Sequence, residues 1–510
     1  MVFKSRTWLK ISACLGVFLI LLGAVTMVFV NDIYSLIINE TMVVSPDCVR
    51  YEPWRKSQYP LTFRVYLFNW TNPEEYPGGG RPRVVETGPY TYSEYDEKVD
   101  LQWHKNNTVS YRQSKLWYFD PGRSNGSLDD PITTADIVSL TAATLAEKSS
   151  YVFQRVVSVW CTLSSTHTVD ELLFAGHRHF LLRITSSTSF LSGGSTFPYT
   201  KFGFFYMANG SSQAEGVFNM ATGAGNVSEA GLLKRWNHSN RTGYFPGRCG
   251  QVLGSGGEMW PPWRTKNDTL WLFSKGLCTS LSLGFEEEAL VEGIAGYRYV
   301  PDRGNFDRGG CYCHEGRPCP GPGVLDMAAC MFGSPMYLSF PHFLGADPAL
   351  ARAVDGVRPD PRRHRFSVTI EPTTGIPLEI LGRTQFNVML EAKPNIRTLK
   401  SLPTTLLPVM WVEVAWRLDA GKAAELRLLV SLGRTLRACC LALLGLGAIA
   451  VAASVLLLAR RPRRPDTPEE LNKKTKKENN NQVRYKVPKK LNIRPCESES
   501  SVEPVGNKCR

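Results

Sequence analysis

The chain has 510 residues, of which 43% are hydrophobic and 21% are charged, so its composition is that of a folded protein and excludes a disordered or fibrous one. Its net charge of +13 lies almost entirely at the two ends, because residues 1–10 and 460–510 together carry +11. A nearly neutral body argues against a nucleic-acid-binding domain, and basic ends are typical of segments that flank a membrane.

The first predicted element is a membrane-spanning helix over residues 11–30, which contain no charged side chain and follow a basic N-terminal tail, residues 1–10. At about 1.5 Å per helical residue, such a run covers roughly 30 Å, the thickness of the hydrocarbon core of a bilayer. A cleaved signal peptide is the alternative. It has a shorter apolar core and a small-residue cleavage pattern, and no such pattern follows Val30.

Residues 31–437 contain no repeat or linker, so we expect one large domain, and their sequence favours an antiparallel sheet or barrel. Gly- and Pro-rich turns separate stretches rich in β-branched and aromatic residues. These stretches predict strands at 61–70, 89–95, 366–370 and 385–390. Within 132–180, glycine and proline are nearly absent and apolar residues recur at helical spacing, which predicts two or three helices.

Glycosylation sequons place this domain outside the cytosol. All nine Asn-x-Ser/Thr sequons fall between the two apolar runs, and neither tail contains one. They begin at Asn39, Asn69, Asn106, Asn125, Asn209, Asn226, Asn237, Asn240 and Asn267.

The cysteines agree with an oxidising compartment, because six of the eight in the predicted domain lie within 249–330. They are Cys249, Cys278, Cys311, Cys313, Cys319 and Cys330. A clustered, even set predicts a disulfide framework, although six cysteines allow fifteen pairings. A zinc site on Cys311, Cys313 and His314 is the alternative. Cys48 and Cys161 are predicted to be free thiols, with a bridge between them as the alternative.

A second apolar run, residues 438–459, predicts another span. Four arginines follow it at once and three basic residues precede the first span, so the positive-inside rule places both termini in the cytosol. Small residues four apart, Ala438 with Ala442 and Ala448 with Ala452, favour self-association of this span into a homo-oligomer. The basic tail 460–510 is predicted to be disordered.

No sequence motif indicates an enzyme. There is no G-x-S-x-G nucleophile elbow, H-E-x-x-H zinc motif or P-loop, and we predict neither a catalytic residue nor a metal or cofactor. His342 and the His177, His179 pair are interpreted as structural or exposed side chains.

Eight short motifs occur in a fixed order between the two spans. They are NPEE (72–75), TGPYTY (87–92), TVSY (108–111), MWPPW (259–263), CYC (311–313), GVLDMAAC (323–330), SFPHFLGADP (339–348) and EPTTGIPL (371–378). With the two spans, they closely resemble the class B scavenger receptor family, and the similarity runs from about residue 2 to residue 460. Only the basic tail falls outside it.

The resemblance implies an α+β ectodomain: a large antiparallel β-barrel with an apical helical bundle at about 132–180 and an apolar tunnel leading toward the bilayer. It also implies the disulfides Cys249–Cys311, Cys278–Cys330 and Cys313–Cys319. Scavenging members carry lysines on the apical helices, whereas residues 156–166 contain none here. We therefore expect neutral or amphipathic lipid at the apex. The predicted contacts are Lys148, Phe153, Arg155, Val157 and Trp160, and the alternative is that the apolar members pack the bundle.

The predicted function is a plasma-membrane receptor that binds fatty acids, sterols, carotenoids, lipophilic odorants or lipoprotein-like carriers and passes lipid to the membrane unaltered. A lysosomal or endosomal receptor of the same fold is the alternative, and the absence of a sorting signal disfavours it. A two-span ligand-gated channel is another alternative. Its spans should place polar groups along a pore, whereas these spans contain only Ser12, Thr26 and Ser454 besides thiols.

Overall fold

The computed structural model describes residues 2–187, 199–302, 304–306, 312, 321–460, 473 and 475. They belong to two compact units. The first unit comprises Met1–Met27 with Cys439–Arg510, and the second is Val28–Ala438. Apart from Arg460, Lys473 and Thr475, the predicted basic tail lies outside the described residues.

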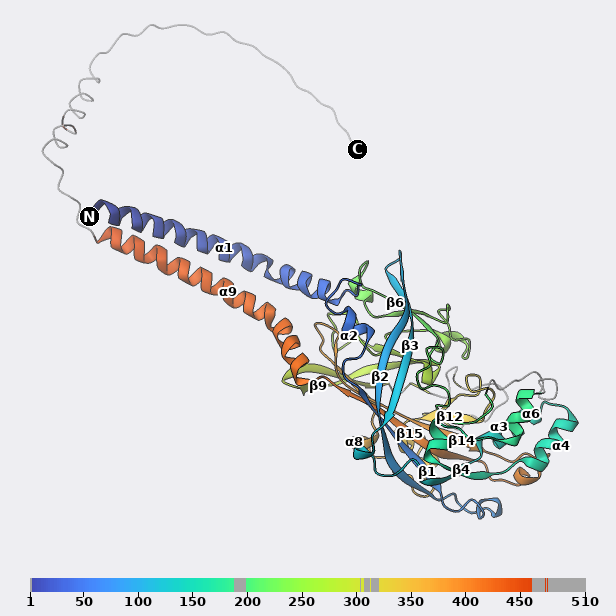
Figure 1. Ribbon diagram of the computed structural model, residues 1–510. Helices are drawn as coiled ribbons and strands as arrows, with labels where there is room; N and C mark the ends of the chain where they lie inside the picture. Colours follow the sequence, from blue (N-terminus) through green and yellow to red (C-terminus); the bar gives the residue numbers. More distant parts are fainter. Residues whose placement is uncertain are drawn as a thin grey trace, which may run out of the picture. The chain divides into compact units, whose positions relative to one another are not determined.

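Two long apolar helices contain the predicted spans. Helix α1 covers Val2–Met42 and helix α9 covers Ala420–Ala459, and both are long and apolar enough to cross a membrane. They run side by side in the first unit (Figure 1). A Cβ atom at Gly16 would lie 2.8 Å from the carbonyl oxygen of Gly447, so the two backbones approach each other closely there.

The alanines predicted to drive self-association are all exposed on α9. They do not take part in the glycine contact between α1 and α9, so they remain available for a second copy. Self-association of this span stays a prediction.

A 13-stranded antiparallel sheet builds most of the second unit. Its main path runs β7-β6-β3-β2-β1-β15-β14-β13-β10-β9-β8, and β12 joins β11 to β14. The strands are β1 Leu61–Trp70, β2 Val84–His104, β3 Thr108–Phe119, β6 Val217–Ala221, β7 Leu233–Trp236, β8 Leu270–Ser274, β9 Thr279–Val291, β10 Ile294–Pro301, β11 Leu325–Asp326, β12 Met336–Ser339, β13 Ser367–Ile370, β14 Pro377–Leu390 and β15 Thr405–Arg417. The antiparallel sheet predicted from the sequence is confirmed, and β1 has the predicted bounds.

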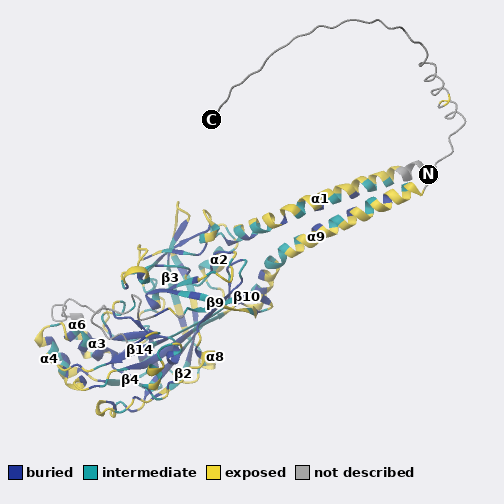
Figure 2. Ribbon diagram, turned by 180° about the vertical axis from the view of Figure 1, so that it is seen from behind, coloured by how far each residue is buried: buried dark blue, intermediate teal, exposed yellow. Residues whose placement is uncertain are grey.

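The central strands are apolar because both of their faces are buried (Figure 2). On β1, Phe63, Val65 and Leu67 belong to one buried cluster. Tyr66 and Phe68 point to the opposite face and belong to another, larger cluster. Strand β1 pairs with β15, so the first and the last strand of the sheet in chain order are neighbours.

One residue nearly closes the sheet into a barrel. Ser255 bridges Leu232, just before β7, and also Leu272 in β8, so it lies between the two end strands of the main path. The amide of Ser255 donates to Trp271 O over 3.0 Å, and its carbonyl accepts from Phe273 N over 2.9 Å. The unpaired edges of β7 and β8 are thereby partly satisfied.

Helices and one hairpin gather at one end of the second unit (Figure 1). Strands β4 and β5 pair as a two-stranded sheet and flank α3 and α4 in the sequence, and α5 and α6 follow β5. Their bounds are β4 Pro131–Ala135, α3 Ile137–Ala146, α4 Tyr151–Trp160, β5 Ser164–Thr168, α5 Val169–Leu173 and α6 Phe180–Ser187. The range predicted as helical therefore also contains a hairpin. The short helices α2 Tyr51–Arg55, α7 Pro348–Arg352 and α8 Pro361–His364 lie elsewhere in the chain.

The bridges of Ser255 to Leu232 and Leu272, here called the seam, predict that substitutions at two nearby glycines differ sharply in their effect on stability. Gly254 has φ +83°, and a Cβ there would lie 1.9 Å from Trp271 O, whereas a Cβ at Gly256 meets nothing nearer than 3.6 Å. We expect Gly254→Ala to destabilise the protein by at least about 1–3 kcal/mol, because it strains the backbone and pushes β8 away. Thermal unfolding measures this, with Gly256→Ala as the matched control. Equal midpoints for the two variants would contradict the role of the seam.

Candidate functional site

Helix α4 has one buried face and one exposed apolar face. Ser150 caps its N-terminus, where its hydroxyl accepts from Phe153 N over 3.3 Å. Phe153 and Val157, one helical turn apart, are fully buried in the core of the unit. These two predicted contact residues therefore cannot lie on an exposed ligand surface. The bundle-packing alternative holds for them, because their side chains take the helix face that points inward.

Other apolar residues of this helix form the exposed surface instead. Val159 is 74% exposed and Trp160 is 52% exposed, and the Trp160 ring lies 4.3 Å from the Phe180 ring of α6, measured between centroids. We call this surface the α4/α6 patch, and it consists of Tyr151, Val152, Val159, Trp160 and Phe180. Of these, only Trp160 was named from the sequence. Once Phe153 and Val157 are known to be buried, the helical phase accounts for the exposure of Tyr151, Val152 and Val159.

Two cations accompany the α4/α6 patch. Arg155 lies between Tyr151 and Val159 in the i, i+4 row of α4, and Lys148 precedes the helix. Both are exposed, and neither forms an ion pair with the residues that the structure describes. The patch thus offers an apolar surface next to two unpaired positive charges, which suits an amphipathic molecule with an anionic group.

A buried polar cluster fixes α3 and α6 below this surface. Asp136 caps α3 and accepts from Ser139 N over 3.0 Å. His179, directly before α6, lies 3.2 Å from the same carboxylate, and Thr162 also donates to it. Burial alone would raise the pKa of Asp136, but the contacts with His179, Thr162 and Ser139 lower it to about 2. The carboxylate is held as an anion by its partners, which is a structural arrangement.

A second buried cluster has the composition of a metal site. One ligand atom from each of Glu86, His342 and His364 lies within 4.8 Å of the others. His342 Nε2 is 2.6 Å from Glu86 Oε2, and Trp411 Nε1 donates to the same oxygen over 2.9 Å. Burial alone would raise the pKa of Glu86, but these hydrogen bonds and the charge of Arg363 lower it to about 2.

The imidazole tautomers argue against a metal at this cluster. His342 Nδ1 accepts from Arg358 N, and His364 Nδ1 accepts from Asp360 N, each over 3.0 Å. In neutral His342 the proton is therefore on Nε2, which is the atom that faces Glu86 and would have to bind the metal. The burial and hydrogen bonds of His342 fit its interpretation as a structural side chain.

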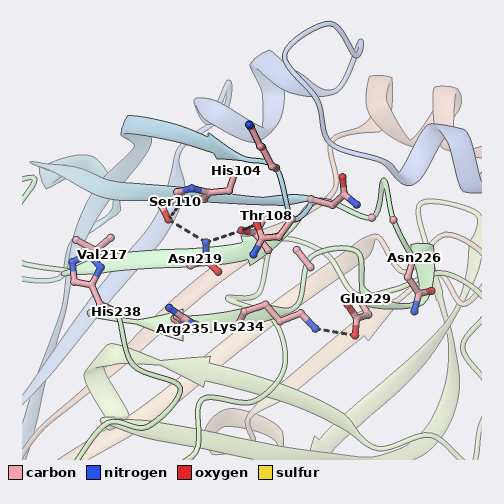
Figure 3. Close-up of a pocket in the computed structure, with 16 residues that line it drawn as sticks. His104, Thr108, Ser110, Val217, Asn219, Asn226, Glu229, Lys234, Arg235 and His238 are labelled. Carbon is pink, nitrogen blue, oxygen red and sulfur yellow. Dashed lines mark hydrogen bonds and ion pairs between the residues drawn. The ribbon is translucent and has the colours of Figure 1, made fainter.

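A polar cleft of about 860 Å³ opens between the β2–β3 hairpin, β6 and β7 (Figure 3). Asn219 Nδ2 lies at its wall and donates to Thr108 Oγ1 over 3.0 Å and to Ser110 Oγ over 3.1 Å. Lys234 pairs with Glu229 over 2.9 Å. Asn106 and Asn226, the first residues of two sequons, also line the cleft.

The cysteines of the domain are partly described. A disulfide links Cys278 and Cys330, with the Cα atoms 6.4 Å apart, which is a pairing that the family resemblance implies. Cys249 is also disulfide-bonded. Cys311, Cys313, Cys319 and the His314 of the zinc alternative lie outside the described residues, so the other two pairings stay predictions that peptide mapping of the unreduced protein would test. Cys48 and Cys161 are free thiols.

Seven of the nine sequon asparagines are exposed, and Asn39 and Asn69 are half-buried. Asn39 lies on α1, where its side-chain oxygen accepts from Trp263 Nε1 over 2.9 Å. Asn69 lies in β1, and its side-chain oxygen accepts from Thr133 N over 2.9 Å. Their partial burial makes both asparagines less accessible for modification than the exposed seven.

Comparison with known proteins gives a consistent result. The sequence profile of the CD36 family matches residues 13–458. The chain is 35% identical over 412 residues to Protein peste of Drosophila melanogaster, covering 78% of this chain and 73% of that protein. It is 31% identical to Scavenger receptor class B member 1 of Rattus norvegicus, covering 78% and 79%. It is also 31% identical to Sensory neuron membrane protein 1 of Ostrinia furnacalis, covering 71% and 73%.

The stacked histidines His167 and His177 predict a pH dependence of stability. The rings of His167 and His177 stack with centroids 3.6 Å apart. Burial and the nearby His167 lower the pKa of His177 to about 4, whereas an unfolded histidine titrates near about 6.5. Between these pH values His177 is protonated in the unfolded chain and neutral in the folded chain. Stability contributed by His177 is therefore lost as the pH falls from about 6.5 to about 4.

We expect His177→Phe, which keeps the stacked ring without a titrating group, to reduce the decline of the melting temperature across this pH range. Part of the decline should remain, because burial and the nearby His342 lower the pKa of His364 to about 4 as well, so this residue also loses stability in the same pH range. The exposed His238, substituted by Gln, serves as the control. Identical pH profiles for His177→Phe and the wild type would refute the assignment.

Proposed function

Because this chain belongs to the CD36 family and is a scavenger-type membrane receptor, we propose that it captures lipid or a lipid carrier at the α4/α6 patch and delivers the lipid to the membrane. The observation that carries the proposal is the exposed apolar surface of α4 and α6 beside Lys148 and Arg155. A relative that covers most of the chain bears the name of a scavenger receptor, which supports the same class of ligand.

The α4/α6 patch favours fatty acids and other amphipathic lipids over extended polyanions. Each CH₂ group that leaves water contributes about 0.8 kcal/mol, so an acyl chain gains most of its binding energy from apolar surface. Arg155 and Lys148 provide charge for one anionic headgroup, whereas a polyanion would require a larger array of cations. Sterols, carotenoids, lipophilic odorants and lipoprotein-like carriers use the same apolar contact.

Delivery to the membrane is proposed to use an apolar path through the barrel-like sheet. The large buried cluster that includes Tyr66 and Trp411 also includes residues of α3 and α4, so apolar side chains are continuous from the patch helices to the strands. Such a path needs no catalytic residue, and the lipid is expected to emerge chemically unaltered. Plasma-membrane location is part of this proposal, with an endosomal or lysosomal membrane as the alternative.

The proposed topology places both termini in the cytosol and residues 31–437 outside. Basic residues precede the first span and follow the second, so they lie on the terminal side of each span. Protease added to intact cells should spare epitope tags at both termini and digest the segment between the helices. Removal of either tag under conditions in which the membrane stays sealed would contradict this topology.

The α4/α6 patch predicts a defined loss of ligand binding. The double variant Val159→Ser, Trp160→Ser removes apolar area and should weaken binding of a fluorescent long-chain fatty acid by about tenfold or more, equivalent to about 1.4 kcal/mol or more. Val85→Ser is the control, because Val85 is also an exposed valine but lies on β2. Binding to the purified receptor and uptake by cells are both measured. Unchanged binding in the double variant would refute the patch as the capture site.

The path through the barrel is tested in the same system with a photoreactive fatty acid. Crosslinks should appear on α4 and also on buried residues of β12 and β14, and the lipid extracted from the cells should be intact. Crosslinks confined to α4, or a hydrolysed lipid, would contradict transfer through the barrel. Ligand-evoked current without lipid uptake would favour the channel alternative.

A further inference from the structure

The polar cleft is lined by hydrogen-bonding groups, and its lining includes no Phe, Tyr or Trp side chain. Its walls come from the β2–β3 hairpin, β6, β7 and the loop between β6 and β7 (Figure 3). Lys105, Arg235 and His238 are exposed at it and have no ion-pair partner among the residues that the structure describes. Amides, hydroxyls and flexible cations are groups that bind hydroxyl-rich ligands, and they offer little to an acyl chain. The cleft is therefore distinct in chemistry from the α4/α6 patch.

Two sequons from different parts of the sequence open into this one cleft. In the first, Thr108 Oγ1 donates to Asn106 Oδ1 over 2.8 Å. In the second, Ser228 Oγ donates to Asn226 Oδ1 over 2.7 Å. Each asparagine oxygen is thus held by the hydroxyl of its own sequon. The amide nitrogens, which would carry the sugar, have no hydrogen-bond partner within the described part of the chain.

The two sequon segments are in direct contact. A Cβ at Gly225 would lie 2.5 Å from Asn107 Nδ2, so the β2–β3 turn packs tightly on the loop that carries Asn226. Asn107 O accepts from Thr222 N over 2.9 Å, and Thr222 O accepts from Val44 N over 2.9 Å. Val44 follows α1 by two residues. The segment after α1 is therefore hydrogen-bonded to the residue that follows β6, and β6 forms one wall of the cleft.

We propose that the N-glycans of Asn106 and Asn226 occupy the polar cleft and brace the β2–β3 hairpin against β6 and β7. The carbohydrate would come from a lipid-linked oligosaccharide pyrophosphate. The asparagine nitrogen forms a bond to the anomeric carbon and loses a proton, and the lipid pyrophosphate leaves. The first sugars of each chain then lie within reach of Lys105, Arg235 and His238, which bind their hydroxyls. The carbohydrate forms part of the support for the end of α1.

The accessibility of individual glycans tests the proposal on the wild-type protein. The full-length receptor is expressed in cells that add N-glycans, purified in detergent and treated with an endoglycosidase, and release at each site is followed by mass spectrometry. Carbohydrate on Asn106 and Asn226 should be released at least about tenfold more slowly than carbohydrate on Asn125 and Asn267, which are exposed and do not line the cleft. Unfolding the protein should make the four rates equal.

A pair of matched variants tests the bracing. The Asn106→Gln, Asn226→Gln double variant should exchange backbone hydrogens faster in residues 217–238 than the wild type, whereas the Asn125→Gln, Asn267→Gln double variant should not. Equal release rates in the folded protein, Asn106 and Asn226 without carbohydrate, or unchanged hydrogen exchange would overturn the proposal. Saturable binding of inorganic phosphate to the glycosylated protein, lost in Lys105→Ala, Arg235→Ala, would assign the cleft to a free anion instead.

Discussion

The pairing of β1 with β15 is the constraint on which the rest of the domain depends. These strands lie closest in sequence to α1 and α9 on the main sheet path, and they pair antiparallel with Val65 opposite Val412. The chain that follows β1 must therefore return to the side of β1 when it forms β15. Glu413 on β15 holds three adjacent strands together, because it binds Arg64 of β1 and Arg383 of β14. Both helices are thus joined to one continuous hydrogen-bonded core.

Two buried carboxylates of this domain, those of Asp136 and Glu86, are paired with neighbouring side chains. Asp136 accepts from its capping partners, and Glu86 accepts from His342 and Trp411. A buried carboxylate with such partners stabilises a particular arrangement of helices and strands, and it loses stability when a partner is removed. The proposed functional contacts lie on exposed surfaces: an apolar one at α4 and α6, and a polar one at the β2–β3 hairpin.

The sequence interpretation was most accurate where the pattern is local. Strand β1 has the predicted bounds, and the apolar runs form the two long helices. It was least accurate on the ligand surface, where Phe153 and Val157 are buried and Val152 and Val159 are exposed in their place. Apolar residues occupy both faces of α4, so the sequence alone does not show which face the core takes. The β4–β5 hairpin was also missed, because its short strands are rich in Ser and Thr and depend on pairing with each other.

The amino-acid sequence by itself determined the two spans, the position of the sequons between them and the family, because these depend on local composition and on short motifs in order. Only the tertiary structure decided which strands end the sheet path and how one residue of a glycine-rich turn, Ser255, bridges them. It also decided that Asn106 and Asn226, far apart in the chain, share one cleft. The physical reason is that strand pairing uses backbone hydrogen bonds between distant segments, and nearly every residue carries these groups, so a local pattern does not specify which strands become neighbours.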